Sequence, residues 1–170
     1  MGRRIGIAVA CAVLVLGALS FAAFRIANAW SRASVELNRI GAPRHFDRYR
    51  GSKRGGGLFC IDTCPSVVHS YDVSAVSLGE AGSELRAQLI AAGYHVGPTR
   101  SCTALGYGAT VRITCGIDGA KSGYQAELGL IVAPSARTPI PRPGAALPID
   151  IPSTTPIERV DISVTADHLL

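Results

Sequence analysis

Uncharged residues dominate the beginning of the chain. Residues 5–24 form a run of twenty amino acids without a charge, with two arginines before it and Arg25 after it. A helix of that length spans about 30 Å, roughly the hydrocarbon thickness of a bilayer. The run therefore predicts a transmembrane helix. The helical pattern continues from Arg25 to Ile40 and is expected to end at Gly41-Ala42-Pro43, because proline cannot extend it.

Residues 1–29 also contain the parts of a secretory signal, including Ala27-Asn28-Ala29 as an A-x-A-like cleavage site before Trp30. Three features favour a retained anchor. The apolar run is longer than the roughly 7–15 residues of a signal peptide, Arg25 separates it from the cleavage site, and tryptophan is a good interfacial anchor. We therefore predict a membrane anchor, with cleavage after Ala29 as the alternative.

Beyond residue 58 the apolar residues recur at regular spacings. They recur at every second position in several segments and at helical spacing in one. Gly93 is expected to cap that helix, and Asp118-Gly119 to open a hairpin. The expected elements are strand 66–73, a helix from Glu80 or Ser83 to Ala92, an edge strand over 94–104, and strands 109–117 and 124–132. Residues 58–133 thus predict a small α+β domain of β-α-β-β-β order, an antiparallel sheet with one packed helix.

The segment 134–170 has a different composition. Seven prolines lie between Pro134 and Pro156, so this part is predicted to be an extended, Pro-rich C-terminal extension. Val160, Ile162 and Val164 alternate with polar residues and predict a terminal strand, pairing with an edge of the same sheet or with another molecule. We expect a partner surface on this strand, or on the edge near Tyr94–Arg100.

Charge is distributed unevenly along the chain. The net charge of +5 combines +6 over residues 25–56 with −3 over residues 57–170 and +2 before the anchor. Residues 30–57 are predicted to be a basic, Gly-rich juxtamembrane linker, flexible and solvated. Because the bases lie outside the predicted domain, nucleic acid is not expected as a partner. Membrane lipid is expected as a partner, through contacts with its anionic headgroups. The candidate membrane-surface residues are Arg44, Arg48, Arg50, Lys53 and Arg54.

Four cysteines follow the anchor: Cys60, Cys64, Cys102 and Cys115. An even count in a short domain behind an export signal predicts two disulfides. We expect a bond between Cys102 and Cys115, on neighbouring strands, and a bond between Cys60 and Cys64; a link from either of the latter to Cys102 or Cys115 is the alternative. Redox chemistry at Cys60 and Cys64, or zinc with histidines, competes with this interpretation, but neither motif has the usual spacing.

The chain offers few residues for catalysis. Its four histidines are scattered, its serines lack a nucleophile-elbow context, and Gly79-Glu80-Ala81-Gly82 lacks the residues of a phosphate loop. We therefore expect no enzyme, catalytic residue, metal or cofactor. The sequence predicts a single-pass cell-membrane protein with a disulfide-stabilised extracytoplasmic domain that interacts with a protein or envelope partner. The alternatives are a cleaved, secreted ligand-binding module and a thiol-disulfide exchange factor using Cys60 and Cys64.

Overall fold

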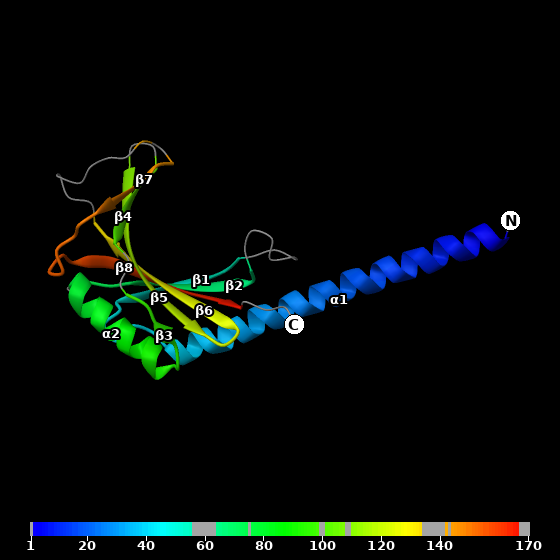
Figure 1. The fold of residues 1–170 in the computed structure, drawn as a ribbon, viewed down its shortest axis with the longest axis horizontal. Helices are drawn as coiled ribbons and strands as arrows, with labels where there is room; N and C mark the ends of the chain where they lie inside the picture. The colour runs from blue at the N-terminus through cyan, green and yellow to red at the C-terminus, as the bar shows by residue number, and fades with distance from the viewer. Residues whose placement is uncertain are drawn as a thin grey trace.

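The structure is a computed structural model that describes residues 2–55, 64–74, 76–98, 101–107, 110–133, 142 and 144–166. The described elements form one antiparallel sheet with helices on one face, and the long first helix projects away from the domain (Figure 1). In chain order they are α1 (Gly2–Ile40), β1 (Arg48–Gly55), β2 (Ser66–Asp72), α2 (Leu78–Ala91), β3 (His95–Val96), β4 (Cys102–Tyr107), β5 (Thr110–Lys121), β6 (Tyr124–Val132), β7 (Ala146–Ile149) and β8 (Ile157–Ala166).

Helix α1 is a single helix with two different parts. Its apolar first part, including Leu14, Leu19 and Phe24, is exposed, and α1 is long and apolar enough to cross a membrane. Its last part packs on β8 and β2 and buries one face. The residues of that face recur at helical spacing: Ala29, Ala33, Leu37 and Ile40. The helix ends as predicted, at Gly41, whose positive φ of 82° suits glycine.

The sheet has the order β1-β2-β8-β6-β5-β4-β7, with β3 paired to the end of β5. The predicted strands 66–73, 109–117 and 124–132 correspond to β2, β5 and β6. The predicted edge strand 94–104 is two short strands, β3 and β4, separated by Gly97 and Pro98. Proline and glycine interrupt the ladder there because the first lacks an N–H and the second has no side chain to pack.

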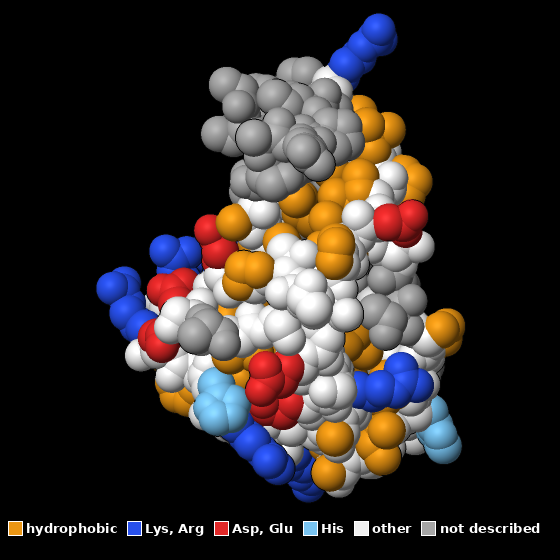
Figure 2. Space-filling view, turned by 90° about the vertical axis from the view of Figure 1, so that its left-hand side faces the viewer, with side chains coloured by type: hydrophobic (Ala, Val, Ile, Leu, Met, Phe, Trp, Pro, Cys, Tyr) orange, Lys and Arg blue, Asp and Glu red, His pale blue; other side chains and the backbone are white. Residues whose placement is uncertain are grey.

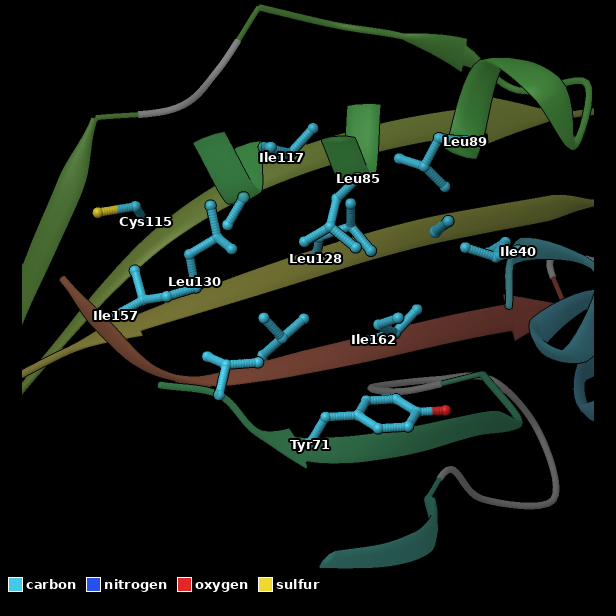
Figure 3. Close-up of a cluster of buried hydrophobic side chains, with 14 of the residues drawn as sticks. Ile40, Tyr71, Leu85, Leu89, Cys115, Ile117, Leu128, Leu130, Ile157 and Ile162 are labelled. Atoms are coloured by element: carbon cyan, nitrogen blue, oxygen red, sulfur yellow. The ribbon is translucent and has the colours of Figure 1, made fainter. Parts of the chain in front are cut away.

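The core fills the space between the helices and one face of the sheet. Leu85 and Leu89 of α2 face Ile117, Leu128 and Leu130 of β5 and β6, all of them buried (Figure 3). Helix α2 begins at Leu78, earlier than predicted, because Ser77 caps it by accepting a hydrogen bond from the Glu80 N–H. Gly93 follows the helix with a positive φ, as predicted. The opposite face of the sheet carries the polar residues of the alternation.

The predicted linker 30–57 needs correction. Its first third is helix α1 in the core, and Arg48–Gly55 forms strand β1, paired along its length with β2. The sequence of β1 has no apolar alternation because its side chains are mostly exposed. An edge strand of this kind is held by its backbone ladder, which leaves little trace in the sequence.

The predicted C-terminal extension also differs from the structure. Strand β8 lies between β2 and β6 in the middle of the sheet, with Val160, Ile162 and Val164 fully buried. The terminal strand was expected to pair with an edge of the same sheet or with another molecule, but it pairs on both sides within this sheet. The prolines all precede Ile157, where β8 begins, and do not interrupt it. A partner surface on Val160–Val164 is therefore excluded. In the described part of the chain, β1, β7 and β3 each pair on one side. Strand β4 lies between β5 and β7, so only the β3 part of the predicted edge strand 94–104 is at an edge. The partner surface expected near Tyr94–Arg100 stays a prediction.

Candidate functional site

A buried ion pair fixes the long first helix, α1, to the domain. Glu36 of α1 is 4% exposed, and its carboxylate accepts from Lys121 Nζ at 3.0 Å and from the Arg39 guanidinium at 2.6 Å. Lys121 also donates to the carbonyl of Ala92, just after α2. The contact joins α1, the end of β5 and the end of α2 at one point. It therefore sets the rotation of α1 about its own axis relative to the sheet.

Tyr94 lies against this ion pair. Its ring centroid is 5.6 Å from Lys121 Nζ, and its hydroxyl is buried with no hydrogen-bond partner among the described residues. Burial, followed by the charge of Glu36, raises the pKa of Tyr94 to about 12. Sequence analysis did not identify this cluster. The available signal was an acid, Glu36, on the same helical stripe as the alanines and Leu37.

The end of the domain nearest the exposed part of α1 contains Trp30. Its Nε1 donates to the carbonyl of Gly55, the last residue of β1, at 2.9 Å. Strand β1 therefore runs along α1 toward the apolar part of the helix (Figure 1). Of the five predicted membrane-surface residues, Lys53 and Arg54 lie beside this contact. We label this end membrane-proximal, by its position beside the part of α1 that is long and apolar enough to cross a membrane.

The other three predicted membrane-surface residues lie toward the opposite end. Arg48 is six residues before Arg54, a separation of about 20 Å along a strand. Arg50 pairs with Asp72 at 3.0 Å, and Arg44 follows the far end of α1, where its backbone N–H donates to the Glu84 carboxylate. The five residues do not form one patch.

The histidine on β2, His69, belongs to an aromatic cluster. Its ring contacts Tyr49 with centroids 5.4 Å apart, and its Nδ1 lies 3.3 Å from the Tyr71 hydroxyl. Phe46 packs on the other side of Tyr71, with centroids 5.3 Å apart. Burial lowers the pKa of His69 below its ordinary value. The arrangement fits a packing role that holds β1 on β2.

The uncovered face of the sheet carries an ion network near its membrane-distal end. Arg112 of β5 donates to Asp161 of β8 at 2.8 Å, and Arg159 lies 3.4 Å from the same carboxylate. Each of these charged side chains has a partner of opposite sign. The network is therefore explained by its role in stabilising the sheet through cross-strand ion pairs.

Two hollows of similar size lie at opposite ends of the domain. One, of about 500 Å³, is on the uncovered face near the membrane-proximal end, with polar lining residues that include His95, Gln125 and Thr165. The other, of about 460 Å³, opens at the membrane-distal end between the start of α2 and residues 149–153. Figure 2 looks onto this distal end, where hydrophobic side chains gather over its upper half. We call the second hollow the distal groove.

The distal groove is open because two of its α2 residues, Gly79 and Gly82, have no side chain. Backbone hydrogen bonds from Leu78 to Thr155 and from Gly79 to Ser153 tie the groove's two walls together. The lining is mostly apolar with a few polar groups, which is the usual composition of a binding pocket. It consists of Leu78, Gly79, Gly82, Ser83, Arg86, Ser101, Cys102, Cys115, Leu130, Ile149, Asp150, Ile151 and Ser153. No sequence motif marked it, because its walls come from distant segments.

Cys102 and Cys115 form a disulfide, as predicted, with both residues buried. The register of β4 on β5, which pairs Thr103 with Thr114, brings the two cysteines opposite each other. The bond lies in the wall of the distal groove. Cys64 is half-buried just before β2, and Cys60 lies outside the described residues, so the expected second disulfide stays a prediction.

Among the described residues, no group of three histidine, cysteine or acidic side chains is placed to hold a metal ion. The arrangement offers a long apolar helix fixed to the domain, a basic end of β1 beside that helix and a mostly apolar distal groove. Comparison of the chain with protein-family models, curated proteins and solved structures finds no match.

Proposed function

We propose that this chain is a single-pass membrane protein that holds a non-enzymatic interaction domain at the extracytoplasmic side of the cell membrane. The observation that carries the proposal is the continuity of α1. Its exposed apolar part has the length and composition of a membrane span, and its last part belongs to the domain core. The same helix therefore serves as anchor and as core element, with no flexible segment between the two roles.

This continuity favours a retained anchor over a cleaved signal. Ala27-Asn28-Ala29 lies inside α1, and Ala29 is fully buried against the domain. Cleavage after Ala29 would remove a core residue and leave Trp30, which bonds to Gly55, at a frayed helix start. A signal peptide has no need to share its last residue with the core of the mature protein.

The disulfide between Cys102 and Cys115 supports an extracytoplasmic domain, because disulfides persist in oxidising compartments. The distal groove supports an interaction role. It opens at the end of the domain away from the anchor, where a protein or envelope component has access to it. We propose that this groove takes an apolar segment of the partner, and that the exposed Asp150 in its lining contacts a polar group of that segment.

The test is the intact mass of natively expressed protein, alkylated without prior reduction, from membrane and medium fractions. Ala27→Leu, which removes the small residue from the candidate cleavage site, is the matched variant. The proposal expects a membrane-bound, full-length mass for both proteins, with Cys102 and Cys115 unalkylated. A wild-type mass that begins at Trp30 in the medium, restored to full length by Ala27→Leu, would overturn the anchor.

The groove also supports the second candidate, a secreted ligand-binding module, because its volume of about 460 Å³ is within the usual range for small-molecule pockets. Release into the medium would select this candidate. A thiol-disulfide exchange function at Cys60 and Cys64 predicts that these two thiols react with alkylating reagent after mild reduction while Cys102 and Cys115 remain bonded. Inert Cys60 and Cys64 would exclude it.

A further inference from the structure

We infer that Lys53 and Arg54, at the membrane-proximal end of β1, bind the headgroups of anionic phospholipids and so hold the domain against the bilayer in one orientation. This inference rests on the retained anchor proposed above and adds a lipid class and a specific contact. The anionic headgroup is the occupant that the charge of this surface selects.

The position of Trp30 and of the end of β1 relative to the bilayer supports the inference. Trp30 follows Phe24, the last residue of the apolar run, by six residues, or about 9 Å of helix. The headgroup region is about 5–7 Å thick on each side of a bilayer, so Trp30 lies at its outer boundary. Because Trp30 Nε1 bonds to the Gly55 carbonyl, the end of β1 lies at the same level. Lys53 and Arg54 are the next two residues back along the strand.

The positive charges of Lys53 and Arg54 also support the inference. The cross-strand partners of Lys53 and Arg54 are Val68 and Val67, so the two side chains leave opposite faces of the same edge strand. Both are exposed, and neither makes an ion pair within the part of the chain that the structure describes. Long basic side chains of this kind reach toward a membrane surface while their stems lie along the protein. Arg25 adds a third positive charge on α1 at the same end.

The rigid attachment of α1 to the sheet also supports the lipid contact. The buried contact between Glu36 and Lys121 sets the rotation of α1 relative to the sheet. The basic end of β1 therefore cannot swing away from the membrane as it would on a flexible linker. Arg48 lies about 20 Å farther along β1, about two and a half Debye lengths at physiological salt, and is too distant to contribute.

The experiment uses Trp30, the only tryptophan of the chain, as a local reporter. Full-length protein is reconstituted into vesicles of phosphatidylcholine mixed with phosphatidylglycerol, with either one or the other lipid carrying a nitroxide quencher on its headgroup, at the depth where Trp30 lies. Quenching of Trp30 fluorescence by each labelled lipid gives the relative association constant of the anionic over the zwitterionic lipid at this site. Lys53→Gln/Arg54→Gln is the test variant, and Arg44→Gln/Arg48→Gln removes the same net charge at the distant end.

Each basic residue near an anionic surface changes lipid association by about fivefold. We expect the wild type to prefer the anionic lipid, the test variant to lose at least fivefold of that preference, and the control variant to stay within twofold of the wild type. Equal quenching by both lipids, or equal losses in both variants, would overturn the lipid contact alone. Quenching by neither lipid would overturn the anchor itself, so the two failures are distinguishable.

Both variants change exposed side chains. An unaltered emission maximum of Trp30 in pure phosphatidylcholine vesicles shows that its contact with Gly55 is intact. Raising the salt concentration reduces the wild-type preference toward that of the Lys53→Gln/Arg54→Gln variant if the contact is electrostatic. A preference that is insensitive to salt would contradict the inference.

Discussion

Removing Lys121 tests whether α1 is truly part of the folded domain. The substitution Lys121→Met keeps the aliphatic stem but removes the ammonium group that Glu36 Oε2 accepts from at 3.0 Å. The Glu36 side chain is only 6% exposed, so the carboxylate cannot exchange this donor for bulk water. Arg39 continues to bond the other carboxylate oxygen. The substitution also removes the hydrogen bond from Lys121 to the Ala92 carbonyl. The loss of the charge-assisted bond to Glu36 together with this second bond is expected to cost about 2–3 kcal/mol, below the 3–5 kcal/mol of a fully broken buried pair.

Equilibrium unfolding of the full chain in urea and mild detergent, followed by Trp30 fluorescence, measures this cost. Glu36→Gln and the double variant complete a cycle, and we expect a coupling energy of about 1–2 kcal/mol between Glu36 and Lys121. The control is Arg50→Gln, which breaks the exposed pair with Asp72 and is expected to cost less than about 1 kcal/mol. A Lys121→Met cost no larger than that of Arg50→Gln, together with no coupling, would refute the reasoning.

Three further predictions follow from the groove wall and the buried tyrosine. Gly82→Ala is expected to raise the free energy of unfolding by about 0.5–1 kcal/mol, because its Cβ would meet side chains at an ordinary 3.8 Å. Gly79→Ala in the same helix should instead destabilise, because its Cβ would lie 3.0 Å from the 149–153 segment; equal urea midpoints would contradict this contrast. Replacing Cys102 and Cys115 with serine should cost about 3 kcal/mol in the same assay, and an unchanged midpoint would show that the bond adds no stability. Tyr94 should ionise near pH 12 in a phenolate absorbance titration, a step that Tyr94→Phe removes. Because its folded pKa exceeds the unfolded value of about 10, its stabilising contribution is complete below pH 10 and is lost as the pH rises toward 12; a wild type as stable at pH 11.5 as at pH 9.5 would contradict it.

Sequence patterns predicted the parts of the fold that bury one face at a regular period. The alternation in β5 and β6 and the spacing of Leu85 and Leu89 in α2 each follow from packing on a single apolar layer. Strand β1 has no such layer to pack on, so its sequence indicated a linker. The end of α1 at Ile40 was predictable because glycine and proline follow it directly.

The order of the strands in the sheet and the shape of the surface could not be predicted from the hydrophobic pattern of the sequence. Alternation in β8 predicted a strand but not its neighbours, since pairing depends on long-range contacts that no local period encodes. The distal groove joins the start of α2 to residues 149–153, far apart in the chain. The Cys102–Cys115 bond was within reach because the two residues are only thirteen apart and lie on strands that a short connection makes neighbours.

The place of β8 has a consequence for how the domain forms. Among the described strands, the pair β1–β2 and the block β6-β5-β4-β7 have no ladder with each other, and β8 alone joins them. Until residues 157–166 are synthesised, the chain holds two half-sheets whose inner edges lack their partner. The domain therefore cannot close during the synthesis of its earlier strands, and its folding depends on distant pairings that form slowly. Such a chain stays open for most of its synthesis, which is compatible with the extracytoplasmic location proposed above.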